Sequence, residues 1–161
     1  MIKRKTINTP FEYPMILFSD GSHLVKVDFL YEEDSIKEYE ETVEEDDQIL
    51  LEAAKQLGEY FKRKRKNFDL PLLSVGTDFQ QKVWQILSSI PYGEIVTYKE
   101  IAEKANSPKA FRAAGGACRA NRFPVIIPCH RVLSTNGKYT GYAGDKVFMK
   151  EKLLNFEAKT K

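Results

Sequence analysis

The second half of the chain carries clear signals for three short helices in succession. The segments "TDFQ" (77–80) and "TYKE" (97–100) each place a threonine three residues before a glutamine or glutamate, which is the spacing of a capping box. In "SPKAF" (107–111) a serine is followed by proline, which suits an N-cap and the first helical position. These signals predict helices over residues 78–89, 98–105 and 108–120.

The last two predicted helices are separated by only two or three residues, which is the outline of a helix-turn-helix motif. Downstream, "STNGKYTGYAG" predicts a glycine-rich hairpin or loop, and "KVFMKEKLLNFE" predicts a final helix. A helix-turn-helix followed by such a wing is a DNA-binding layout. Purely structural helical bundles have the same geometry, so that alternative stays open.

The first half predicts a small α+β unit. "MILFSDGSHLVKVDF" alternates as two strands joined through Asp20 and Gly21, and apolar residues then recur at helical spacing from Asp47 onward. Pro71 and Gly76 mark a connector. We therefore predict an α+β fold of two domains. Their boundaries are 1–70 for the α+β domain, 71–76 for the connector and 77–161 for the mostly helical domain.

Composition limits the environment and the partners. No apolar run approaches the roughly 18 residues of a membrane span, the N-terminus lacks a secretion signal, and only two cysteines occur, so we expect a cytoplasmic protein with free thiols. Residues 1–75 hold 11 Lys and Arg against 16 Asp and Glu, whereas residues 76–161 hold 14 against 7. The basic half suits a polyanion such as nucleic acid, although an ordinary surface can carry such an excess.

The predicted helix 108–120 has an unusual face. Arg112 and Arg119 stand seven residues apart, with Gly115 and Gly116 between them on the same side. Each glycine costs about 1 kcal/mol relative to alanine inside a helix. A floor without side chains would let the backbone approach a DNA minor groove, or would permit tight helix packing. The opposite side collects Phe111, Ala114 and Cys118, the last as a small core residue.

The segment "IPCHRV" places Cys129 beside His130 after an apolar run. A free cysteine is only a few per cent thiolate at neutral pH, so a nucleophilic role requires a base or a positive environment. Side chains of neighbours in an extended segment point to opposite sides, which favours contact through a bridging water. Glu157 shares the apolar face of the final helix and is the candidate partner of the imidazole, or it lies in water at the chain end. The scattered cysteines and histidines do not match zinc-site spacing, so no metal is expected.

At this point the chain resembles the O6-alkylguanine-DNA alkyltransferases. The resemblance runs through "PYGEIVTYKEIA", "SPKAFRAAGGACRANRFPVIIPCHRV", "NGKYTGYAG" and "KEKLLNFE", over about residues 77 to 157. It implies a ribonuclease H-like N-terminal domain and a winged helix-turn-helix domain. It also implies single, irreversible transfer of an alkyl group from O6 of guanine, or O4 of thymine, in double-stranded DNA to Cys129, with no cofactor and no obligate protein partner, by a monomer.

The same resemblance implies roles for individual residues. Glu157 orients His130, which deprotonates Cys129 through a water, and Asn121 holds the active-site turn. Tyr98 supplies a proton to the leaving base, and Arg112 fills the gap left by the flipped nucleotide. The further DNA contacts that we expect are Thr97, Ala110, Gly115, Gly116 and Arg119, and the expected pocket residues are Pro124, Val132, Tyr142, Ala143 and Gly144.

Two other functions compete with this one. Alkyltransferase-like proteins recognise lesions without chemistry, but they carry tryptophan where this chain has Cys129. A cysteine enzyme that does not act on DNA would turn over a small substrate and would not need Arg112.

Overall fold

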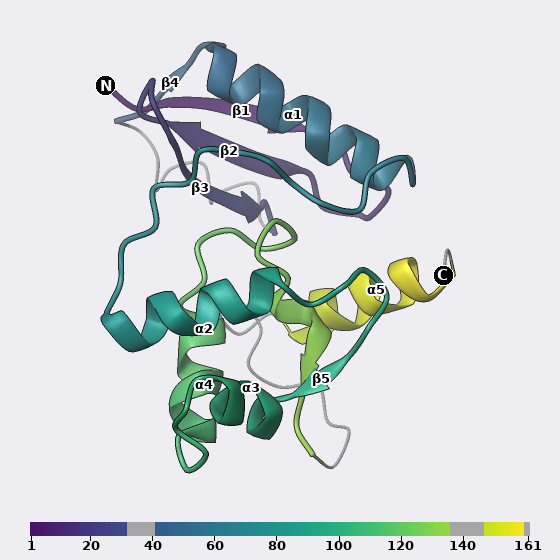
Figure 1. The fold of residues 1–161 in the computed structure, drawn as a ribbon. Helices are drawn as coiled ribbons and strands as arrows, with labels where there is room; N and C mark the ends of the chain where they lie inside the picture. Colours follow the sequence, from purple (N-terminus) through teal and green to yellow (C-terminus); the bar gives the residue numbers. More distant parts are fainter. Residues whose placement is uncertain (32–40, 136–146, 160–161) are drawn as a thin grey trace. The chain divides into compact units, whose positions relative to one another are not determined.

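The computed structural model describes residues 1–31, 41–135 and 147–159. The chain divides into two compact units, Met1–Ser74 and Val75–Lys161 (Figure 1). The first contains a four-stranded sheet and one long helix, and the second is mostly helical. The predicted α+β class is confirmed.

The sheet of the first unit has the strand order β3-β2-β1-β4. The predicted hairpin is present: β2 (Met15–Ser19) pairs antiparallel with β3 (Leu24–Phe29), and Gly21 supplies the positive φ of 95° that the turn requires. β1 (Lys3–Ile7) pairs antiparallel with β2, and β4 (Val43–Glu44) runs parallel to β1. All five residues of β2 are buried, so this central strand forms the middle of the core.

Helix α1 (Gln48–Phe61) begins where the sequence predicts it, at the N-cap Asp47, whose side chain accepts a hydrogen bond from the backbone N–H of Leu50 at 2.8 Å. Figure 1 shows α1 running along one face of the sheet. The helix ends at Phe61, so the basic run of residues 62–66 follows the helix instead of forming its last turn. Its buried face consists of Leu50, Ala53, Gln56, Leu57 and Tyr60.

The second unit is built on α2 (Asp78–Ser88), α3 (Tyr98–Lys104) and α4 (Phe111–Arg119). The capping box before α2 is complete, and before α3 the Thr97 hydroxyl accepts from the Glu100 backbone N–H at 3.1 Å. Trp84 of α2 donates from its indole Nε1 to the carbonyl of Ala117 in α4 at 2.9 Å. The indole hydrogen bond joins α4 to α2, and α3 packs against both helices.

The connection between α3 and α4 differs from the sequence prediction. Asn106 takes a left-handed conformation with φ of 57°, and the backbone N–H of Ser107 donates to the carbonyl of Ala102, which closes α3 in a Schellman-type cap. Ser107 is therefore part of the end of α3 and does not cap α4. The N–H of Ala110 donates to the Ser107 carbonyl in a further turn, so α4 starts at Phe111 and six residues separate the two helices.

Two elements complete the unit. Strand β5 (Val96–Thr97) pairs in parallel with β6 (Val132–Leu133), with Thr97 opposite Leu133. The final helix α5 (Val147–Ala158) forms over nearly the predicted residues. The predicted wing falls mainly on residues 136–146, outside the described part of the chain.

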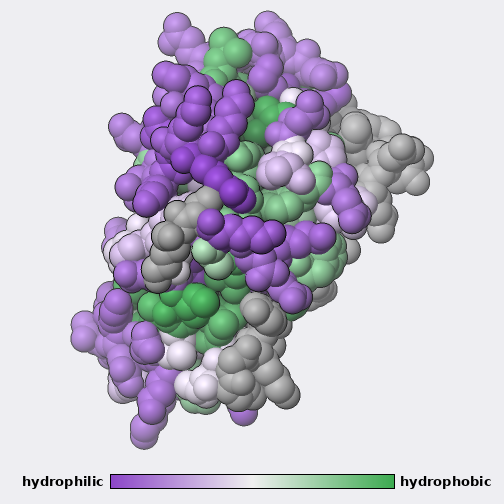
Figure 2. Space-filling model, turned by 90° about the vertical axis from the view of Figure 1, so that its right-hand side faces the viewer, coloured by the Kyte–Doolittle hydropathy of each residue, from purple (hydrophilic) through white to green (hydrophobic). Residues whose placement is uncertain are grey.

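Hydrophilic residues predominate on the face drawn in Figure 2, and hydrophobic residues reach the surface there in limited patches. Single exposed apolar side chains are ordinary on a protein surface. Within the described ranges, no helix combines the length and apolar character needed to cross a membrane.

Candidate active site

Cys129 opens a single turn of 3-10 helix, Cys129–Arg131, and its side chain is completely buried. The Arg131 N–H donates to the carbonyl of Pro128 at 3.0 Å, which closes this turn. The prediction of an extended segment here was therefore wrong. In a 3-10 turn successive side chains point about 120° apart, so Cys129 and His130 still leave the backbone in different directions.

Asn121 ties the loop that precedes the cysteine to the sulfur itself. Its Nδ2 donates to the carbonyl of Ile127 at 2.9 Å and to Cys129 Sγ at 3.3 Å. Its Oδ1 accepts from the backbone N–H of Phe123 at 2.9 Å. A donor aimed at the sulfur favours its anionic form over the thiol. One side chain therefore both shapes the loop and places a donor against the sulfur.

His130 and Glu157 form a buried pair between the 3-10 turn and α5. His130 Nε2 lies 2.7 Å from Glu157 Oε2, and neither side chain is exposed. The alternative that Glu157 lies in water at the chain end is therefore excluded. His130 Nδ1 has no hydrogen-bond partner among the described residues. When Nε2 carries the proton and donates it to Glu157, Nδ1 is left with a free lone pair that can accept a proton.

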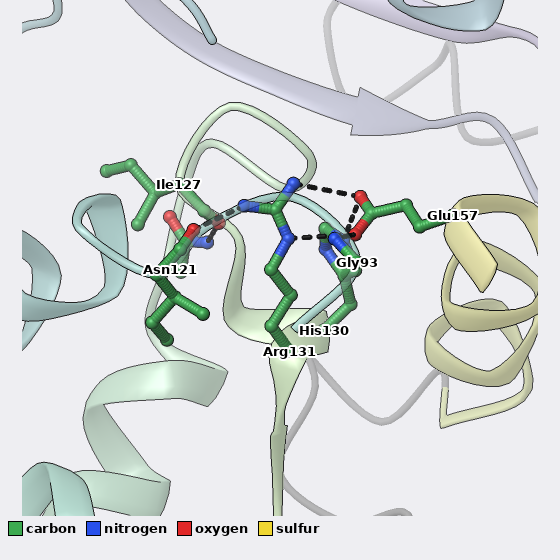
Figure 3. Close-up of polar contacts among 7 residues, drawn as sticks. Gly93, Asn121, Ile127, His130, Arg131 and Glu157 are labelled. Carbon is green, nitrogen blue, oxygen red and sulfur yellow. Dashed lines mark hydrogen bonds and ion pairs between the residues drawn. The ribbon is translucent and has the colours of Figure 1, made fainter. Parts of the chain in front are cut away.

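Arg131 was not identified from the sequence, yet it contacts the same carboxylate. Its Nε donates to Glu157 Oε1 at 2.8 Å and its Nη2 to Oε2 at 3.0 Å, while Nη1 donates to the Ile90 carbonyl at 2.7 Å. The backbone N–H of Gly93 reaches Oε1 at 3.2 Å. Figure 3 shows the guanidinium and the imidazole meeting the carboxylate that projects from α5. The available clue was that a carboxylate on an apolar helix face needs a cation.

Burial and the neighbouring charges shift the pKa of each group in this cluster in opposite directions. Burial alone would raise the pKa of Glu157, but the charge and hydrogen bond of His130, followed by those of Arg131, outweigh it and hold the pKa well below the ordinary 4.5. For His130, burial lowers the pKa below its ordinary 6.5, by more than Glu157 raises it. The cluster therefore consists of an ionised glutamate and a neutral histidine near neutral pH.

Tyr98 stands at the first position of α3 and is almost completely buried. The parallel pairing of β5 with β6 brings the residue before it, Thr97, alongside the strand that follows the 3-10 turn. The Tyr98 hydroxyl accepts a hydrogen bond from Lys150 Nζ of α5 at 2.9 Å. Lys150 was also missed, although it shares the buried face of the final helix with Leu153, Leu154 and Glu157.

A hollow of about 620 Å³ lies along α4, and Tyr98 of α3 contributes to its wall. Arg112, Gly115 and Arg119 line it, as their predicted shared face requires. Phe111, predicted on the opposite side, also lines it and is 48% exposed, because α4 begins at this residue and leaves its side chain outside the core. Ala114 and Cys118 are buried as predicted. The remaining lining residues are Lys99, Pro108, Ser134 and Thr135.

The other predicted residues fall in three places. Ala110 is the N-cap of α4, without a side-chain hydrogen bond, and Gly116 is half-buried on that helix. Pro124 and Val132 are buried on either side of the 3-10 turn. Tyr142, Ala143 and Gly144 lie outside the described residues. Across the described ranges, no group of three or more His, Cys, Asp or Glu side chains is arranged to hold a metal ion.

Comparison with known proteins gives one answer for both units. Residues 78–159 match the 6-O-methylguanine DNA methyltransferase, DNA binding domain, and residues 2–73 match the ribonuclease-like domain of the same family. The constitutive methylated-DNA–protein-cysteine methyltransferase of Bacillus subtilis is 50% identical over 156 residues, which cover 94% of this chain and 93% of that protein. The corresponding protein of Methanosarcina barkeri is 44% identical over 144 residues, covering 89% and 90%.

A solved structure agrees with these sequence matches. The crystal structure of Mycobacterium tuberculosis OGT in complex with DNA superposes with a TM-score of 0.84 at 37% identity, covering 98% of this chain and 94% of that one. The two domain matches together span nearly the whole chain, and the relatives have a similar length. The chain belongs to the 6-O-methylguanine DNA methyltransferase family.

Proposed function

We propose that this protein repairs double-stranded DNA by transferring an alkyl group from O6 of alkylguanine, or O4 of alkylthymine, to Cys129, once per molecule and as a monomer. One observation carries the proposal. A buried cysteine accepts a hydrogen bond from Asn121, and the next residue is a histidine held by a buried glutamate. Such an arrangement is suited to making and protecting a thiolate nucleophile.

Activation begins with the thiol proton of Cys129. The lone pair on His130 Nδ1 accepts it through a bridging water, while Glu157 keeps Nε2 in the donor role and stabilises the imidazolium that forms. Asn121 donates to the resulting thiolate. Arg131 holds Glu157 ionised, so the carboxylate does not itself take the proton.

Transfer then forms one bond and breaks another. The thiolate attacks the alkyl carbon, an S–C bond forms, the C–O6 bond breaks, and its electron pair stays with the base. Tyr98 donates its hydroxyl proton to the base, because a neutral base leaves more readily than an anion. A thioether is left on Cys129, and it has no route back to a thiol in this site.

The lesion has to leave the base stack before it can reach a buried sulfur. The face of α4 around the hollow fits that task. Arg112 enters the stack in place of the flipped nucleotide, and the glycines let the helix backbone approach the minor groove. Arg119 contacts phosphate, with Thr97 and Ala110 at the adjoining helix starts.

The test is mass spectrometry of the protein after incubation with duplex DNA containing O6-methylguanine. We expect a gain of one methyl group on Cys129, lost in Cys129→Ser and kept in Cys118→Ser, whose thiol is buried in α4. A second duplex with O4-methylthymine tests the wider lesion range. An unmodified protein that still binds the lesion tightly would contradict transfer and support recognition without chemistry.

A further inference from the structure

Lys150 is a buried lysine on α5 with 0% of its surface exposed. Lysine is almost never fully buried, because removing an ammonium group from water is costly. Burial lowers the pKa of Lys150 to about 8, although the nearby sulfurs of Cys129 and Cys118 favour its charged form. Lys150 is thus a buried basic group within electrostatic reach of the Cys129 sulfur.

The hydrogen bond from Lys150 to Tyr98 has only one possible direction while the lysine is protonated. An ammonium group has three donors and no acceptor, so its Nζ donates to Tyr98 Oη over the observed 2.9 Å. The Tyr98 hydroxyl hydrogen is therefore not used in this contact and is directed to a different acceptor. Nζ also lies 5.2 Å from the centroid of the Tyr98 ring, close enough for a favourable cation–π contact.

Tyr98 connects this cation to the surface that receives DNA. It lines the same hollow as Arg112 and Gly115, while its hydroxyl contacts Lys150. A positive charge next to a phenol stabilises the phenolate that forms when the phenol gives up its proton.

We propose that Lys150 is a positioning residue that aims the Tyr98 hydroxyl at the departing base and replaces the proton that Tyr98 donates. The inference rests on the proposed function. As the C–O6 bond breaks, its electrons stay on the base, the base takes the proton of Tyr98, and the phenolate takes a proton from Lys150 Nζ. The products are a thioether, a neutral base, a neutral tyrosine and a neutral lysine, so the charges of the thiolate and the ammonium disappear together.

A double-mutant cycle with Lys150→Met and Tyr98→Phe tests this directly. Methionine has nearly the length of lysine without its charge. With free O6-benzylguanine as the alkyl donor near neutral pH, we expect Lys150→Met to slow alkylation of Cys129 by about 10- to 100-fold. In the Tyr98→Phe background the same change should cost less than about twofold, because the residue through which Lys150 acts is gone. Equal losses in both backgrounds would overturn the inference.

The pH dependence of the alkylation rate distinguishes this role from a merely structural one, because a structural lysine would not change the shape of the profile. Lys150 is charged below its pKa of about 8, so the rate of the unsubstituted protein should fall as pH rises through that value. This falling limb should be absent in Lys150→Met and equally absent in Tyr98→Phe. It should persist in Lys152→Met, a half-buried lysine on the same helix. A falling limb that survives in Tyr98→Phe would refute the relay, even if Lys150→Met does not fold.

Two controls separate this inference from the proposed function. If the unsubstituted protein does not react with free O6-benzylguanine or lesion DNA, the proposed function fails. If it reacts but the cycle is additive, only the role of Lys150 fails. The melting temperature of Lys150→Met should be unchanged or higher, because an apolar side chain replaces a buried charge.

Discussion

Among the residues that the structure describes, an imidazole, a guanidinium and a backbone N–H all donate hydrogen bonds to Glu157, and each restrains it in a different way. The imidazole of His130 takes one oxygen, the guanidinium of Arg131 spans both, and the backbone N–H of Gly93 reaches the other. The carboxylate can neither rotate nor readily accept a proton. His130 is consequently held neutral, with its Nδ1 acceptor on the side of the ring away from Glu157. This is the state that a base for Cys129 requires.

Replacing Glu157 by glutamine should disable this base while changing little in size. The amide has only one oxygen to pair with the guanidinium. Its NH2 group is a donor and would face N–H groups that donate hydrogen bonds to the carboxylate. We expect alkylation of Cys129 by free O6-benzylguanine to slow by about 100-fold, with the midpoint of its pH–rate profile moved upward. The amount of alkylated protein, measured at fixed times after the reaction is quenched and over a range of pH, gives both the rate and the midpoint.

The matched control is Glu151→Gln, an exposed glutamate on the same helix, which should react like the unsubstituted protein. A normal profile for Glu157→Gln would remove Glu157 from the activating network.

Residue types and spacing were enough to group Cys129, His130 and Glu157, because a thiol needs a base and a carboxylate on an apolar helix face needs a partner. They did not reveal Arg131 or Lys150. Both cations are buried by contacts from distant parts of the chain, to Glu157 and Tyr98 respectively. Basic residues are usually exposed, so their types alone predict surface positions.

Helix α4 has an exposed arginine at its second position, next to an exposed phenylalanine, on the edge of the hollow. We expect Arg112→Ala to weaken repair of duplex DNA by about tenfold or more, since unstacking costs a few kcal/mol that the side chain partly offsets. Reaction with free O6-benzylguanine should be unchanged, because no base needs to be flipped. Parallel rate measurements with the two donors decide the matter.

Arg122→Ala is the control for charge alone, since Arg122 is exposed just beyond α4. Equal losses on both donors in Arg112→Ala would reject a role in base flipping.

The two glycines of α4 can now be considered separately. A Cβ on Gly115 would lie 4.0 Å from the ring of Tyr98, which is an ordinary contact distance, and a Cβ on Gly116 would meet no described residue within 4 Å. Packing against the described part of the chain therefore does not require glycine at position 116. The second explanation that we considered for that position, approach to DNA, is the one that a substitution can test.

Gly116→Ala should consequently raise stability and lower DNA affinity. Alanine stabilises a helix interior by about 1 kcal/mol relative to glycine. A methyl group on the groove-facing side should weaken binding of duplex DNA by several-fold, on the order of 1 kcal/mol. Denaturant unfolding and DNA titration measure the two effects.

Gly58→Ala provides the comparison, because a Cβ on Gly58 in α1 would likewise meet none of the residues that the structure describes within 4 Å. It should give the stability gain without the loss in affinity, and unchanged affinity in Gly116→Ala would contradict the proposed contact.

Helix starts were predictable where one side chain could serve one cap, as at Thr77 and Thr97. The start of α4 was not, because Ser107 has two candidate uses and the end of the preceding helix takes it. The two-residue strands β5 and β6 are too short to show any period in sequence. Local signals therefore located most of the elements but not the pairing that brings Tyr98 beside the active-site turn.

At the scale of the whole molecule, the α+β class and a helical C-terminal half followed from the sequence because strand and helix periods change clearly along the chain. The ion cluster adds a property that the pattern does not contain. His130 is held neutral and Glu157 ionised, so the folded chain resists protons that the unfolded chain binds. Stability should therefore fall as the solution becomes acidic.

The sign is the same for both groups. The pKa of His130 is lowered below 6.5, so the free energy of unfolding should start to decrease as pH falls through that value. The pKa of Glu157 is lowered below 4.5, and a second decrease should follow beneath it. Thermal unfolding followed by the fluorescence of Trp84, the single tryptophan, reports the second unit at each pH. Glu157→Gln should lack the lower of the two decreases, and an identical acid profile would contradict this assignment.

The complete burial of Cys129 also determines when the protein is used up. Reagents that alkylate DNA attack accessible thiols as well, and a protein that can react only once would be spent by them before it met a lesion. A sulfur withdrawn from solvent is shielded from small electrophiles that no part of the site holds, and it is reached by an alkyl group on a base that occupies the site. Burial of Cys129 should thus spare most molecules for alkylated bases that fit the site, and the repair capacity of a cell under chemical attack would then depend on how many such chains it holds.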